Sequence, residues 1–247
     1  MSGRRAVRAG LLVLGVALIA LCARLLLGDL SADRSLRELK EQVEASEATA
    51  SLDAPDGEAW VNPDTAGWLE VGGTDVSYPV TLSSGDEDPD FYLTHDYWKR
   101  RNWRGNPYLD VRGGAEGAHL MVYGHKLGLT GGMFSSLRDR YQQASFDRLG
   151  ALKWTPVGGE TETYVPVFAM KVDKGYSPIQ RFEFEDEGEL ASWLLAVGAD
   201  ASARADGWRE TCERAERVIT LVTCAQLRGG QRDRTVTVFA RTADAVG

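Results

Sequence analysis

The sequence VITLVTC, residues 218–224, and the sequence RTVTVFA, residues 234–240, are the two clearest β-strand patterns of the chain. Both are rich in β-branched residues, which favour strands. If the two strands pair antiparallel, the loop 225–233 returns the chain to the same sheet edge and places Cys224 beside Arg234. A guanidinium beside a thiol favours the thiolate, and it can donate hydrogen bonds to an oxyanion. This pair predicts nucleophilic chemistry, although side-chain periodicity leaves open whether both groups share a face.

Cys224 also has less specific interpretations. Most free cysteines are small, buried hydrophobic residues. In an oxidising compartment, a disulfide between Cys212 and Cys224 is a further possibility. A zinc site is disfavoured because the sequence contains neither a CxxC nor an HExxH spacing.

The chain has three histidines, one of which is placed as a proton-transfer partner would be. His125 follows a predicted strand and a glycine, at a strand-end loop of the kind that displays catalytic groups. His119 begins that strand and His95 lies among aromatic residues, which is more typical of structural histidines. A Cys and a His that are distant in sequence often form a nucleophile pair. We therefore expect Cys224, His125 and Arg234 to share one site.

The chain from residue 60 onward alternates short β-branched and aromatic runs with turn signals. Further strands are predicted at residues 68–71, 74–80, 106–111, 119–123, 152–157 and 163–172. Helices are predicted at residues 133–141 and 186–202, the second with acids at its start and one apolar face. About eight short strands with few helices indicate a mainly β domain, either a sandwich or a barrel.

The charge distribution excludes one class of partner. The formal net charge is −8, and residues 1–28 carry four arginines and no acid, which leaves −12 for residues 29–247. A body this acidic repels polyanions. We therefore expect no nucleic acid among the partners.

The N-terminal part of the chain has the pattern of an anchor and a spacer. A basic tail at residues 1–9 precedes an apolar run at residues 10–27, close to the length that a bilayer requires. The pattern predicts a single-pass transmembrane signal-anchor in the cell membrane with the N-terminus inside. An extracellular, partly helical spacer at 28–59 and an extracellular catalytic domain at 60–247 would follow. A cleaved signal peptide is the alternative.

Several ordered motifs within residues 60–243 resemble those of the class B sortases. Cys224 ends a TLxTC motif, and Arg234 follows ten positions later. His125 ends a YGH motif, which a Met133-Phe134 pair follows. Segments at residues 62–68, 76–80 and 92–96 are also similar to this family. The resemblance implies a closed eight-stranded β-barrel with N-terminal helices and a helix before the cysteine strand, a position that the 186–202 pattern fits.

The resemblance also implies a cysteine transpeptidase reaction. Cys224 would attack the Thr carbonyl of a surface protein's C-terminal sorting signal, of the LPxTG-like or NPxTx-like kind, and form a thioester. His125 would protonate the leaving amine, and Arg234 would stabilise the oxyanion. The acceptor would be an amine from peptidoglycan or a pilin lysine, and neither a metal nor another cofactor is needed. A pilin-polymerising sortase, a secreted Cys–His peptide hydrolase and a non-catalytic binding module are the alternatives.

Substrate contacts follow from the resemblance at four positions. Leu93, Tyr123, Thr223 and Ile179 fall on family positions near the signal peptide. The sequence departs from the family at neighbouring positions, namely Pro89, Pro178 and Ala225. These departures bear on which signal is recognised and leave the chemistry unchanged.

Overall fold

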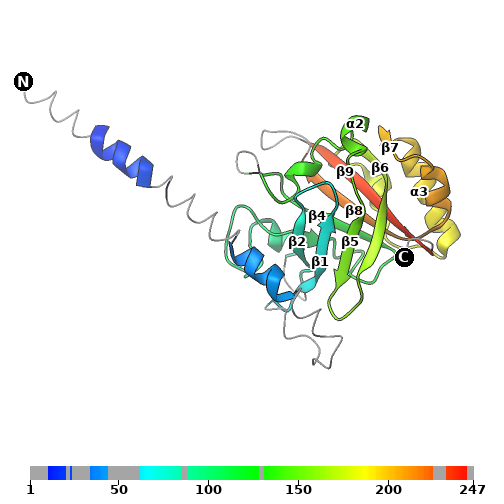
Figure 1. Cartoon of the computed structure of the whole chain (residues 1–247), viewed down its shortest axis with the longest axis horizontal. Helices are drawn as coiled ribbons and strands as arrows, with labels where there is room; N and C mark the ends of the chain where they lie inside the picture. The colour runs from blue at the N-terminus through cyan, green and yellow to red at the C-terminus, as the bar shows by residue number, and fades with distance from the viewer. Residues whose placement is uncertain are drawn as a thin grey trace, which may run out of the picture. The chain divides into compact units, whose positions relative to one another are not determined.

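The chain divides into two compact units, residues 1–59 and 60–247. The computed structural model describes residues 11–20, 23, 34–43, 62–84, 88–127, 131–224 and 232–243. In the first unit, residues 11–20 and 34–43 are helical. The second unit carries all the strands described below (Figure 1).

The predicted membrane anchor is not supported by the structure. None of the described helices is both long and apolar enough to cross a bilayer, so the expectation of a single-pass protein in the cell membrane is wrong. Of the predicted 10–27 segment, residues 11–20 and 23 are described, and the rest lies outside the described residues.

Eight strands of the second unit close into a barrel (Figure 1). They are β1 (Thr65–Val71), β2 (Ser77–Thr81), β3 (Tyr108–Leu109), β4 (His119–Tyr123), β5 (Leu152–Pro156), β6 (Glu162–Asp173), β8 (Ala215–Cys224) and β9 (Asp233–Thr242). Their order in space is β5-β1-β2-β3-β4-β8-β9-β6, and an antiparallel pairing of β5 with β6 completes the ring. The short strand β7 (Ala203–Arg204) pairs with β6 outside the ring. The predicted mainly β, closed eight-stranded barrel is confirmed.

The strands of the barrel contribute to two separate cores. Along β8, Ile219 and Leu221 pack with inner residues such as Trp154, whereas Val218 and Val222 pack into a second cluster outside the ring. A strand that is buried on both faces has a nearly continuous apolar sequence. This explains why residues 218–224 lack the polar alternation of a half-exposed strand.

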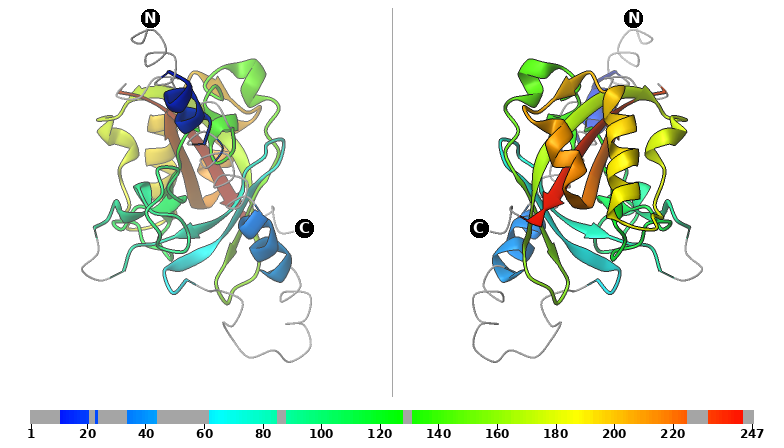
Figure 2. Two further views of the ribbon diagram at one scale, coloured as in Figure 1. Left: turned by 90° about the vertical axis from the view of Figure 1, so that its left-hand side faces the viewer. Right: turned by 90° about the vertical axis from the view of Figure 1, so that its right-hand side faces the viewer.

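Helix α3 (Glu187–Ala199) lies along the outside of the barrel and covers that second cluster (Figure 2). The side chain of Asp186 caps its N-terminus by accepting a hydrogen bond from the Glu189 amide at 2.8 Å. Leu190 and Leu194 bury its apolar face. The prediction of a helix at 186–202, before the cysteine strand, is thus confirmed.

The other helices differ from those predicted. Instead of a helix at 133–141, only Ser135–Leu137 forms a 3-10 turn (η2). Met133 has a φ of 46°, in the left-handed region, so a regular helix cannot begin there. Two short helices, α2 (Gln143–Phe146) and α4 (Trp208–Glu213), were not predicted.

Candidate active site

Three neighbouring strands bring the predicted catalytic residues to one end of the barrel. Strand β8 lies between β4 and β9, parallel to β4 and antiparallel to β9. The Gly124 amide donates to the Val222 carbonyl at 3.1 Å, which holds the start of the His125 loop against β8. In the β8–β9 register, Cys224 stands directly opposite Arg234. The Cys224 side chain lies outside the described part of the structure.

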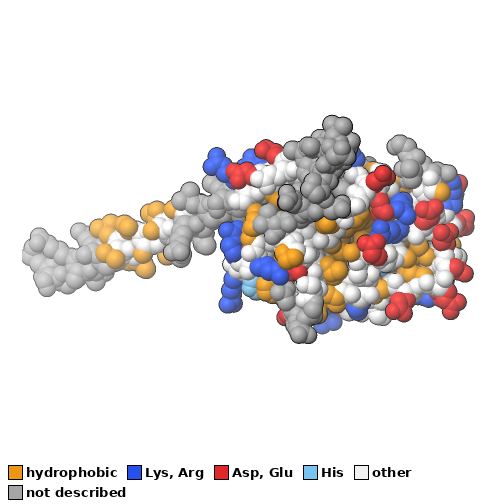
Figure 3. Space-filling model, turned by 90° about the horizontal axis from the view of Figure 1, so that it is seen from below, with side chains coloured by type: hydrophobic (Ala, Val, Ile, Leu, Met, Phe, Trp, Pro, Cys, Tyr) orange, Lys and Arg blue, Asp and Glu red, His pale blue; other side chains and the backbone are white. Residues whose placement is uncertain are grey.

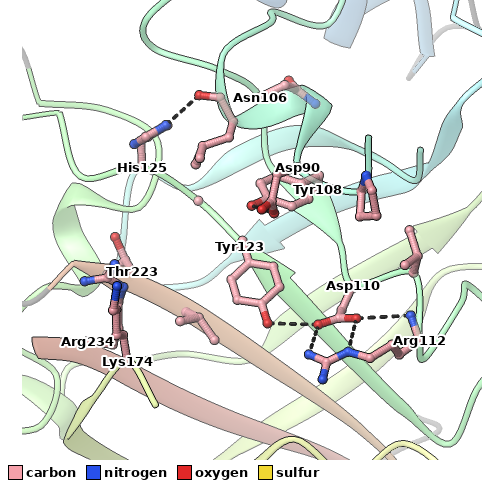
Figure 4. Close-up of a pocket in the computed structure, with 15 residues that line it drawn as sticks. Asp90, Asn106, Tyr108, Asp110, Arg112, Tyr123, His125, Lys174, Thr223 and Arg234 are labelled. Atoms are coloured by element: carbon pink, nitrogen blue, oxygen red, sulfur yellow. Dashed lines mark hydrogen bonds and ion pairs between the residues drawn. The ribbon is translucent and has the colours of Figure 1, made fainter. Parts of the chain in front are cut away.

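A cavity of about 840 Å³ opens at this end of the barrel (Figure 4). Five of the residues that the sequence singled out line it, namely His125, Arg234, Leu93, Tyr123 and Thr223. Ile179 does not line this cavity. It lies in the 3-10 turn η3 (Ser177–Ile179) and lines a smaller adjoining hollow that shares Tyr123 and Arg234 with the first.

His125 is held in one orientation by the backbone around Leu93. Its Nε2 donates to the Leu93 carbonyl oxygen at 2.8 Å, because a carbonyl can only accept. Leu93 ends the 3-10 turn η1 (Phe91–Leu93), so this turn fixes the ring. The Nδ1 atom is then the nitrogen that can give or take a proton at the cavity.

Met133 and Phe134 form hydrogen bonds with the backbone of His125, next to the end of β4. The His125 amide donates to the Met133 sulfur at 2.9 Å, and the Phe134 amide donates to the His125 carbonyl at 3.1 Å. A Cβ placed on Gly124 would come within 2.4 Å of the Phe134 ring. The glycine of the YGH motif is therefore required by the aromatic ring that packs on it.

Gly124→Ala should lower both stability and activity. Overpacking against Phe134 is expected to cost about 1–3 kcal/mol of unfolding free energy and to displace His125. Thermal unfolding and peptide turnover measure the two effects. Gly188→Ala, in the first turn of α3 where only the Asp186 carboxylate is near, should lower neither, because alanine favours a helix more than glycine does. An equal loss of stability in the two variants would contradict the packing argument.

Thr223 presents an unsatisfied hydroxyl at the cavity. Its side chain is 2% exposed, and its Oγ1 has no hydrogen-bond partner in the part of the chain that the structure describes. A buried hydroxyl without a partner is costly. The substrate contact predicted for Thr223 stays a prediction.

A polar network that the sequence did not reveal forms the opposite end of the cavity (Figure 4). Asp110 accepts from Arg112 Nη2 at 2.6 Å and from the Tyr123 hydroxyl at 2.9 Å. Burial raises the pKa of Asp110, but the hydrogen bonds and charge of Arg112 outweigh burial and hold the pKa below its usual value. Burial, helped by the charge of Asp110, raises the pKa of Tyr123. The hydroxyl of Tyr123 is therefore uncharged where the side chain lines the cavity.

The remaining two histidines have structural contacts, as expected from the sequence. His95 stacks on Phe91 at a ring distance of 3.9 Å. His119 is fully buried; its Nδ1 donates to the Arg181 carbonyl at 2.7 Å, and its Nε2 accepts from the Thr220 hydroxyl at 2.7 Å. Burial lowers the pKa of His119 to about 4.

His119 should make the fold acid-sensitive. Its native pKa of about 4 lies below the ordinary 6.5, so the unfolded chain binds the proton first. Its contribution to stability is complete above about pH 6.5 and is lost as the pH falls toward 4, by on the order of 3 kcal/mol. Unfolding measured at pH 7 and pH 5 should show about 2 kcal/mol of this loss, and His119→Asn should flatten it. His95→Asn is the matched control, and an unchanged slope in His119→Asn would refute the assignment.

Cys212 does not pair with Cys224. It is a free, buried cysteine, and burial raises the pKa of its thiol to about 12. The disulfide considered from the sequence is therefore wrong. In the part of the chain that the structure describes, no three His, Cys, Asp or Glu side chains gather to hold a metal ion.

Comparisons with known proteins point to one family. No family model matches the chain. In sequence, it is 26% identical over 182 residues to sortase B of Listeria monocytogenes (71% of this chain and 69% of the relative). It is 23% identical over 180 residues to sortase B of Staphylococcus aureus (72% and 70%).

Solved structures show the same fold. A Staphylococcus aureus sortase B–substrate complex matches with a TM-score of 0.69 at 20% identity, over 86% of this chain and 96% of that one. Sortase B of Clostridium perfringens matches with a TM-score of 0.62 at 22% identity, over 72% and 94%. The barrel and its helices are thus those of the sortase B structures.

Proposed function

We propose that this chain, which its sortase B relatives identify as a class B sortase and a cysteine transpeptidase, cleaves a C-terminal sorting signal of surface proteins at Thr. The acyl group would pass through a thioester to an amine of the cell wall. The observation that supports this proposal best is the register of β8 and β9. It sets Cys224 opposite Arg234, beside a cavity that both Arg234 and His125 line.

The first half of the proposed reaction is acylation. The Cys224 thiolate attacks the Thr carbonyl carbon, and the oxyanion that forms is stabilised by the guanidinium of Arg234. The C–N bond then breaks, and the leaving amine takes a proton from Nδ1 of His125. That nitrogen is assigned because Nε2 is occupied by the Leu93 carbonyl.

The second half transfers the acyl group. An amine enters and loses its proton to Nδ1 of His125, and the thiolate leaves from the second tetrahedral intermediate. Arg234 again stabilises the oxyanion. The cavity of about 840 Å³ is large enough to hold a short peptide.

Mass spectrometry of the purified full chain tests this proposal. The chain is incubated with LPxTG-like and NPxTx-like peptides, with and without an amine. We expect a covalent adduct on Cys224 with one peptide class and an amide product when the amine is present. Cleavage that gives only the free acid, at the same rate with and without amine, would instead identify a hydrolase.

A further inference from the structure

Charged side chains of both signs line the cavity (Figure 4). Lys174 and Arg234 line one end, next to the register position of Cys224, and both also line the smaller adjoining hollow. Away from that end, Asp90 accepts from the Tyr108 hydroxyl at 3.0 Å, and Asp110 is paired with Arg112 at 2.6 Å. Lys174 and Arg234 are therefore the cations that an anionic group of a ligand would meet beside the position of Cys224.

Lys174 has no ion-pair partner of its own among the described residues at this edge, and the adjacent Asp173, whose pKa Arg232 and to a lesser degree Lys174 lower, is paired with Arg232. The neighbouring charges are paired, Lys171 with Asp233 at 3.1 Å and Arg232 with Asp173 at 2.7 Å. Lys174 forms no ion pair with any residue that the structure describes. Its positive charge contrasts with the many acidic side chains elsewhere on the surface (Figure 3).

The backbone holds Lys174 close to the reacting position. Val172 of β6 stands opposite Arg234, which in turn stands opposite Cys224. Adjacent strands lie about 4.8 Å apart, so β6 is about 10 Å from the backbone of Cys224. The Lys174 amide donates to the Arg232 carbonyl at 2.7 Å. This bond fixes the residue beside β9 and within reach of a group that is attached to the attacking amine.

We propose that Lys174 forms an acceptor subsite that selects amines carrying a carboxylate. This inference rests on the proposed function and names the class of its second substrate. The amine nitrogen bonds to the thioester carbon, the C–S bond breaks, and the electron pair leaves on sulfur. The amine proton goes to Nδ1 of His125, and the carboxylate stays intact against the Lys174 ammonium. Lys174 acts in binding and has no part in proton transfer.

Competition between two matched acceptors tests the subsite. Nα-acetyl-lysine and Nα-acetyl-lysinamide present the same ε-amine and differ only in a carboxylate. With the full chain, kcat/KM should favour the carboxylate about fivefold at low salt, as expected for one partly exposed ion pair. The preference should shrink between about 50 mM and about 500 mM salt. Lys174→Gln should abolish it through KM, whereas Lys174→Arg should keep it.

A neighbouring lysine on β6 provides the control for the loss of Lys174. Lys171→Gln, three residues away on β6 and outside both cavities, should keep the wild-type preference. If the thioester forms but Lys174→Gln leaves the ratio unchanged, the acceptor subsite is refuted while the proposed function stands. If no thioester forms with any peptide, the proposed function fails and the subsite fails with it.

Discussion

Cys224→Ala should abolish both thioester formation and product release. Alanine offers no nucleophile, and the neighbouring groups cannot form the acyl intermediate by themselves. Removing a catalytic nucleophile typically lowers turnover by a factor of about 10⁴ or more, which places the variant below detection in a peptide assay. Mass spectrometry with the reactive peptide should show no adduct on the protein.

Cys212→Ala is the matched control within residues 60–247. Cys212 is buried in helix α4, and its thiol has a raised pKa of about 12, so it should contribute no nucleophile. Its removal should lower stability by about 1 kcal/mol while adduct formation continues on Cys224. An adduct that persists in Cys224→Ala and disappears in Cys212→Ala would reverse the assignment of the nucleophile.

The fold could be predicted largely because its strands carry strong local signals. The pattern at 218–224 appears as β8 (Ala215–Cys224), and the pattern at 119–123 appears as β4 with the same bounds. By contrast, residues 106–111 form only the two-residue strand β3. A strand of two residues forms because it pairs with β2 and β4. The local pattern of side chains does not reveal which strands will be its partners.

The prediction for the N-terminus failed for a different reason. Hydropathy over residues 10–27 measures how favourably the side chains transfer from water. It does not measure the length of a helix, and none of the helices that the structure describes is long and apolar enough to cross a bilayer.

The sequence could predict site residues only where a chemically reactive residue type stands in a recognisable motif. His125 and Arg234 could be selected from the sequence because reactive residue types stand at strand ends. Asp110, Arg112 and Lys174 could not, since each becomes significant only when the β3–β4 and β6–α3 loops meet at one cavity. An Asp or a Lys on a loop is most often a solvated surface charge, so no local signal marks these three residues.

Arg234→Ala should lower the rate of acylation by about 10²–10³-fold, the usual loss when an oxyanion donor is removed. Arg234→Lys should lose most of that activity as well, because an ammonium is a point charge and lacks the fork of donors that a guanidinium presents. The result would distinguish hydrogen-bond geometry from mere positive charge at the position opposite Cys224. Single-turnover acylation, followed as the adduct mass over time, isolates this step from acceptor binding.

Arg232 provides the control for loss of an arginine in the same stretch of chain. Its side chain is 64% exposed, it forms an ion pair with Asp173, and it does not line the cavity. Arg232→Ala should therefore acylate at nearly the wild-type rate, since an exposed ion pair contributes little to stability. If Arg234→Ala also acylates at nearly that rate, the oxyanion must be stabilised by other donors, and the guanidinium opposite Cys224 would have no catalytic role.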